Sequence, residues 1–96
     1  MAAAGAATRE SLLRRPEFEL SWMEPSLLVL DVLAPLRAGL VPTLRLPGGT
    51  IIPAALVEGT LDRYAFEIGG EVLDAMRVTM IVPIQAHVEE VSLPLD

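Results

Sequence analysis

The chain has 96 residues, of which 52% are hydrophobic, and this is enough for one small domain with a hydrophobic core. It has no cysteine, which excludes disulfides, a thiolate nucleophile and metal sites built from cysteine. Thirteen acidic residues against seven arginines give a net charge of −6. This balance argues against nucleic-acid binding by the body of the protein, because such a surface needs clustered Lys or Arg.

The charge is uneven along the chain. Residues 1–15 have three arginines and one glutamate, whereas residues 16–96 have four arginines and twelve acidic residues. We therefore predict two parts, an N-terminal arm of residues 1–15 and a single β-rich domain of residues 16–96. Within the arm, Thr8 can cap a short helix from Arg9 to Arg15, which Pro16 would end. A basic arm can lie on the acidic body of a neighbouring copy, so it predicts contacts between subunits, with a solvated tail as the alternative.

The segment from Glu17 to Met23 alternates between apolar and polar residues, which is typical of a strand with one buried face. Its predicted core face consists of Phe18, Leu20 and Trp22. We interpret Trp22 as a core anchor. The alternative is an exposed interface residue, because tryptophan is enriched at binding surfaces.

The next segment, Ser26 to Ala34, is almost entirely apolar and lies between two prolines. This composition favours a strand that is covered on both faces, although a buried helix starting near Pro25 fits the same residues. Asp31 interrupts the apolar run. Since an unpaired buried carboxylate is unfavourable, we expect Asp31 to cap a turn or to pair with an arginine.

Two glycine pairs predict two β-hairpins, because adjacent glycines can both adopt the positive φ of a two-residue type I′ turn. Around Gly69-Gly70, such a turn would place Phe66 opposite Leu73 and Asp62 opposite Arg77. An aromatic side chain would then lie opposite an aliphatic one, and an acidic side chain opposite a basic one. We expect this hairpin to organise the rest of the fold.

The second strand of that predicted hairpin contains an inconsistency. Next to the turn the apolar residues share one face, but from Met76 to Val82 they alternate on the opposite face. A slip of one residue exchanges the two faces of a strand. We therefore predict a β-bulge near Asp74-Ala75, with burial of both faces as the alternative.

The other glycine pair, Gly48-Gly49, predicts a second hairpin. A two-residue turn there would place Leu46 opposite Ile51. Pro42 and Pro53 lie on the two strands and cannot donate a backbone hydrogen bond, so they predict an edge or a bulge in this part of the sheet.

A last strand is predicted from Ala86 to Leu93, and it includes the single histidine of the chain, His87. Glu89 would share the face of His87, a spacing that can bind a metal. Two ligands do not make a site, and the others would have to come from distant acidic residues. We therefore interpret His87, Glu89 and Glu90 as a solvated edge and predict no metal site, no cofactor and no catalytic residue.

Together these segments predict a mainly β fold, a small antiparallel barrel or sandwich of five or six strands with a short N-terminal helix. An α+β arrangement is the alternative. The longest strongly apolar run is too short to span a bilayer, and the first residues lack the pattern of a signal peptide. We therefore expect no membrane contact and a location in the cytoplasm or in a virion.

The serines and the single histidine match no pattern of an acyl-transfer enzyme. We expect a non-enzymatic structural subunit of a multi-subunit assembly, for example a virion head or tail component. Its partners would be other copies of itself, as a homo-oligomer, or other assembly proteins. The alternative is a small acidic protein-binding module, a regulator or an inhibitor, that presents Glu89, Glu90 and Asp96 to a basic partner. The predicted interface residues are Arg9, Leu12, Leu13, Arg14, Arg15 and Trp22.

Overall fold

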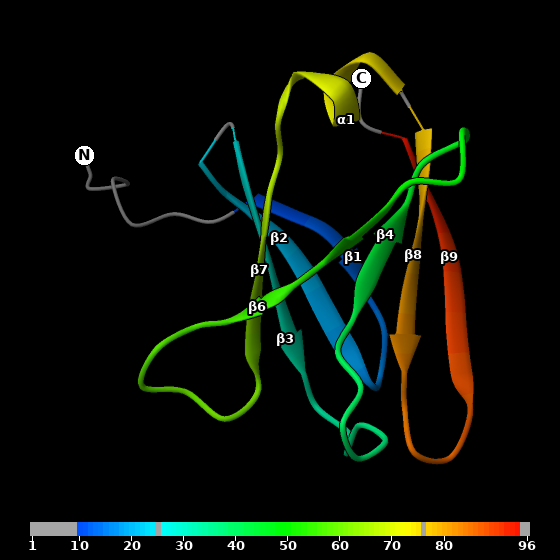
Figure 1. Ribbon diagram of the computed structural model, residues 1–96. Coiled ribbons are helices and arrows are strands. Elements are labelled where there is room, and N and C mark those ends of the chain that lie inside the picture. Colours follow the sequence, from blue (N-terminus) through cyan, green and yellow to red (C-terminus); the bar gives the residue numbers. More distant parts are fainter. Residues whose placement is uncertain (1–9, 25, 76, 95–96) are drawn as a thin grey trace, which may run out of the picture.

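The computed structural model of the protein describes residues 10–24, 26–75 and 77–94, which form two antiparallel β-sheets and one short helix (Figure 1). In chain order the elements are β1 (Glu10–Arg14), β2 (Phe18–Glu24), β3 (Leu27–Val32), β4 (Thr43–Arg45), β5 (Ile51–Pro53), β6 (Ala55–Leu56), β7 (Arg63–Glu67), α1 (Gly70–Ala75), β8 (Arg77–Pro83) and β9 (Val88–Pro94). The first sheet has the order β1-β2-β3-β7-β6 and the second the order β5-β4-β8-β9. This confirms the predicted mainly β fold. The described residues form nine strands, more than the predicted five or six, because several strands are only two or three residues long.

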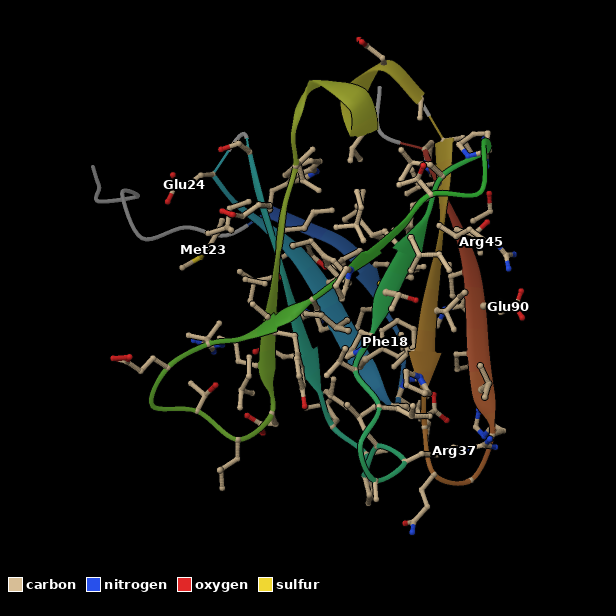
Figure 2. The ribbon with its side chains drawn as sticks, viewed as in Figure 1. Phe18, Met23, Glu24, Arg37, Arg45 and Glu90 are labelled. Carbon is tan, nitrogen blue, oxygen red and sulfur yellow. The ribbon has the colours of Figure 1, made fainter. Side chains whose placement is uncertain are left out.

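The hydrophobic core lies between the two sheets. Both sheets contribute large side chains that are at most 4% exposed, and Figure 2 shows one of them, Phe18, in the interior. The main contributors are Phe18, Leu20, Leu28, Leu30, Val32, Leu44, Phe66, Val78, Met80, Val82, Ile84 and Leu93. Since buried apolar area is the dominant favourable term in folding, this layer holds the two sheets together.

The predictions for the two strands after the arm are confirmed. In β2, Phe18 and Leu20 are fully buried, and Trp22 is half-buried and packs against the core. The segment from Ser26 to Ala34 contains strand β3 and no helix, and β3 lies at the centre of its sheet. Val29, on the face of β3 away from the core, is only 3% exposed, as expected for a strand covered on both faces.

The carboxylate of Asp31 has an arginine partner, which is one of the two arrangements expected from the sequence. Asp31 on β3 lies opposite Arg63 on β7, and Arg63 Nε donates a hydrogen bond of 2.7 Å to Asp31 Oδ1. This hydrogen bond, together with the charge of the Asp31 carboxylate, raises the pKa of Arg63 above its ordinary value. The pair therefore joins two central strands on the outer face of the sheet.

The hairpin predicted at Gly69-Gly70 is wrong. β7 belongs to the first sheet and β8 to the second, and α1 connects them at one end of the molecule (Figure 1). The glycines with positive φ among the described residues are Gly39, Gly49 and Gly59, so neither Gly69 nor Gly70 has the conformation that a type I′ turn requires. The residues after Gly70 include good helix formers, and Val72 of α1 is fully buried in the core.

The β-bulge predicted near Asp74-Ala75 is wrong for the same reason. Phe66 and Val78 both face the core, but from opposite sheets, and α1 lies between them in the chain. The change of phase in the apolar pattern therefore marks a crossing between sheets. A bulge within one sheet would have produced the same pattern.

The hairpin predicted at Gly48-Gly49 is confirmed, with a different register. Arg45 lies opposite Ile51, because Pro47 belongs to the loop and moves the pairing by one residue from the predicted one. The Gly49 amide donates to the Leu46 carbonyl at 2.9 Å, and Gly49 has a φ of 98°. This is a three-residue hairpin loop with glycine at its left-handed position.

The helix predicted from Arg9 to Arg15 is not found. Glu10–Arg14 form β1, which pairs with β2, and Arg9 lies outside the described residues. A helix of two turns is unstable alone, whereas β2 offers the backbone of this segment a hydrogen-bonding partner. β1 is therefore part of the first sheet.

The two sides of the sandwich differ. On one side β5 and β6 are separated only by Ala54, so that almost one continuous strand passes from the second sheet to the first. The amide of the buried Ala54 donates to the Pro42 carbonyl at 2.9 Å. We call this the closed side. On the opposite side, the open side, each sheet ends in an edge strand, β1 in the first sheet and β9 in the second.

Candidate interaction edges

The open side presents two edge strands, each of which pairs with one neighbour within the described residues. β1 pairs with β2, and β9 pairs with β8 over all seven of its residues. The outer edge of such a strand has backbone N–H and C=O groups that a strand of another chain can pair with. These two edges are therefore the candidate interaction surfaces.

The C-terminal end of β1 is basic, although the strand begins with Glu10. Arg14 and the next residue, Arg15, are both exposed. Arg14 Nη2 lies 3.0 Å from Glu19 Oε2, but the Arg14 side chain is 75% exposed. Because exposed ion pairs contribute little, Arg14 can exchange this partner for a carboxylate of another molecule.

The β9 edge is acidic. It has two adjacent glutamates, Glu89 and Glu90. Glu90 Oε1 lies 3.7 Å from Arg45 Nη2, and Figure 2 shows both side chains on the same outer side of the second sheet. The carboxylate of Glu89 contacts the imidazole of His87. Charged residues and Pro94 protect β9 against uncontrolled pairing, so a partner must offset this negative charge.

The predicted interface residues divide into two groups. Leu12, Leu13 and Trp22 are half-buried and pack against the protein's own core, whereas Arg14 and Arg15 are exposed. Arg9, the remaining one, lies outside the described residues, as does Asp96. The structure therefore brings Arg14 and Arg15 together at one edge, and their role in an interface stays a prediction.

The described part of the chain contains no group of three or more His, Asp or Glu side chains that could hold a metal ion. His87 and Glu89, the pair with a metal-ligand spacing, contact each other on the exposed β9 side. None of the described helices has the length and apolar character needed to cross a membrane.

An apolar hollow lies at the end of β3, next to the loop between β6 and β7. Its volume is about 410 Å³, and most of its lining residues are apolar, among them Leu33, Pro35 and Leu61, while Asp62 and Tyr64 also line it. Leu61 is 93% exposed and Leu33 is 65% exposed. Exposed leucines around a hollow are a feature of surfaces that bind other proteins.

Comparisons of the chain with models of protein families, with curated proteins and with solved structures give no match.

Proposed function

We propose that the protein is a non-enzymatic structural subunit that assembles head to tail, with β1 of one copy pairing to β9 of the next. The observation that carries this proposal is the opposite charge of Arg14-Arg15 at the end of β1 and of Glu89-Glu90 on β9, both on the open side. A head-to-tail contact of this kind produces rings, or open filaments when the rotation does not close. A virion shell or tail is one setting for such a subunit.

The proposed pairing is antiparallel, with Arg14 opposite Glu90. Both side chains lie on the outer faces of their sheets, since Arg14 pairs with Glu19 and Glu90 with Ile81. The same register places Leu13 opposite Val91, and both of these pack against their own cores. Apolar residues would therefore meet on one face and opposite charges on the other, which stabilises cross-strand pairs.

Charge also selects against one of the two symmetric alternatives. Pairing β9 with β9 would bring the glutamates of two copies onto one shared edge, whereas antiparallel pairing of β1 with β1 centred on Leu12 would place Arg14 opposite Glu10 and is not disfavoured by charge. Like charges that face each other across strands are destabilising. The backbone hydrogen bonds would supply most of the affinity, and the charges would select the partner edge.

Charge reversal at each edge tests the proposal. We expect Arg14→Glu/Arg15→Glu and Glu89→Arg/Glu90→Arg each to reduce the mass measured by light scattering to that of a single chain. Deleting residues 1–15 would be a poorer test, because it removes β1 and exposes core residues that β1 covers. A 1:1 mixture of the two variants should assemble again, because each restores a complementary edge for the other.

A matched control is Glu58→Arg/Glu67→Arg, which changes the net charge as the Glu89/Glu90 variant does but lies away from β1 and β9. This control should keep the mass of the unmodified protein. The proposal fails if the unmodified protein is a single chain at micromolar concentration, or if both edge variants keep its mass.

The second candidate function is a small acidic protein-binding module, which the apolar hollow beside Leu33 and Leu61 favours. In that case the free protein would be a single chain, and Leu61→Ser would weaken binding to its partner. The same light-scattering measurement separates the two candidates, because only the first requires self-association.

A further inference from the structure

A second hollow lies on the outer face of the second sheet, beside the loop that joins β4 and β5. It has a volume of about 350 Å³. Its polar lining consists of Arg45, Arg77, Thr79 and Ser92, and Pro47 and Gly49 of the loop form one wall. The apolar hollow does not use this surface. The proposed strand pairing uses the outer backbone edge of β9, and Ser92 of the same strand lines the second hollow.

Strand register brings the four polar residues together. Arg45 on β4 lies opposite Thr79 on β8, and Thr79 lies opposite Ser92 on β9. Arg77 is two residues from Thr79 on β8 and so points to the same face. Arg77 Nη1 donates a hydrogen bond of 2.8 Å to Ser92 Oγ, which holds this guanidinium over the hollow.

The charge of the hollow is opposite to that of the protein. Two of the seven arginines of a chain with net charge −6 line this small area. The carboxylate beside Arg45 is that of Glu90, at 3.7 Å, which is longer than a hydrogen bond, and its side chain is 59% exposed. Glu90 therefore leaves the donor groups of Arg45 accessible to a ligand.

From this arrangement we infer that the hollow binds the phosphate group of a small molecule. Two guanidinium groups approach from different strands, and the hydroxyls of Thr79 and Ser92 add further donors. One arginine in bidentate contact already satisfies both oxygens of a carboxylate. A phosphate group has more oxygens, arranged as a tetrahedron, and up to two negative charges, which match two guanidinium groups and two hydroxyls.

Equilibrium dialysis with radiolabelled inorganic phosphate, at constant ionic strength set with sodium chloride, tests this inference. We expect saturable binding of one phosphate per chain. Sulfate, which is also a tetrahedral dianion, should compete, whereas acetate at the same concentration should compete at least about tenfold less well. Equal competition by acetate would overturn the inference, as would phosphate binding that does not saturate.

Substitution at the hollow gives the second part of the test. Arg77→Gln and Arg45→Gln are each expected to weaken phosphate binding by about tenfold, because each removes a charged hydrogen-bond donor. Both side chains are exposed, and circular dichroism will show that each variant keeps the fold. Arg37→Gln removes the same charge outside the hollow and should leave binding unchanged; Figure 2 shows Arg37 and Arg45 well separated on the molecule. An equal loss of phosphate affinity in all three variants would mean that binding depends only on the net charge of the protein, and would overturn the inference.

Discussion

The two glycine pairs occupy different kinds of place in the molecule. Gly48-Gly49 lies within one sheet, in the loop of the hairpin formed by β4 and β5. Gly69-Gly70 lies between the sheets, where the chain leaves β7, forms α1 and enters β8. The same dipeptide therefore ends a turn in one region and begins a helix in the other.

The residues that follow each pair explain the difference. After Gly49 come Thr50 and two isoleucines, which favour a strand, and Gly49 itself has the positive φ that closes the loop. After Gly70 comes a segment with good helix formers, and α1 places Val72 in the core. The comparison teaches that glycines permit a turn, whereas their neighbours decide whether one forms.

The largest expected effect comes from Val72→Asp. Val72 is fully buried, so an aspartate there must lose its hydration without a suitable partner, and we expect the free energy of unfolding to fall by about 3 kcal/mol or more. Urea unfolding measures this change. The matched control is Ile51→Asp beside the other glycine pair, where the side chain is 58% exposed and the expected loss is about 1 kcal/mol or less. Equal losses would show that Val72 of α1 contributes no more to the core than the exposed Ile51 of β5 does.

Gly49→Ala should have the next largest effect. Gly49 has a φ of 98°, which a residue with a Cβ atom adopts only under strain, so we expect a loss of about 1 kcal/mol or more in unfolding free energy. Gly49→Asn should lose less, because asparagine visits positive φ more readily. If alanine and glycine prove equally stable at this position, the loop does not depend on the left-handed conformation.

Gly70→Ala should have the smallest effect and the opposite sign. Gly70 is the first residue of α1, has no positive φ, and a Cβ atom added there meets nothing within 4 Å. Alanine restricts the unfolded chain, so we expect a gain of about 0.4 to 1 kcal/mol. A loss of stability here in thermal unfolding would contradict the distinction between the two glycine pairs.

Local patterns predicted those parts of the fold that depend on neighbouring residues. The alternation in β2 identified the buried Phe18 and Leu20, because burial on one face of a strand requires a period of two. The position of Asp31 within an apolar run indicated that an arginine could lie beside it, because a carboxylate in such a run is stabilised by a nearby positive charge.

Pairing between distant segments could not be predicted in this way. β7 and β8 both have the composition of strands, and nothing within either segment indicates that they enter different sheets. The phase change near Asp74 was the available signal, but a bulge in one sheet produces the same pattern. Likewise, the helix expected over Arg9–Arg15 gave way to β1, because β2 offers a partner that local propensity does not include.

The candidate site was predictable in part. The uneven charge of the chain pointed to Arg14 and Arg15 as exposed basic residues, and both are exposed. The sequence analysis interpreted His87, Glu89 and Glu90 as a solvated edge, and β9 is an edge strand. It did not indicate that β1 is the edge strand of the other sheet on the same side, because a helix was expected there. The hollow between Arg45 and Arg77 was missed because it depends on the register of β4, β8 and β9.

If copies assemble through the open side as proposed, the stability of each chain depends on its neighbours. β1 contributes Leu13 to the covering of the core, yet β2 is the one strand that holds it within the described residues. Edge elements of this kind open locally with less free energy than central strands. A docked copy would give β1 a second hydrogen-bonding partner, so the melting temperature should rise with protein concentration. Dilution alone would then loosen this part of the molecule, without any change of temperature or solvent.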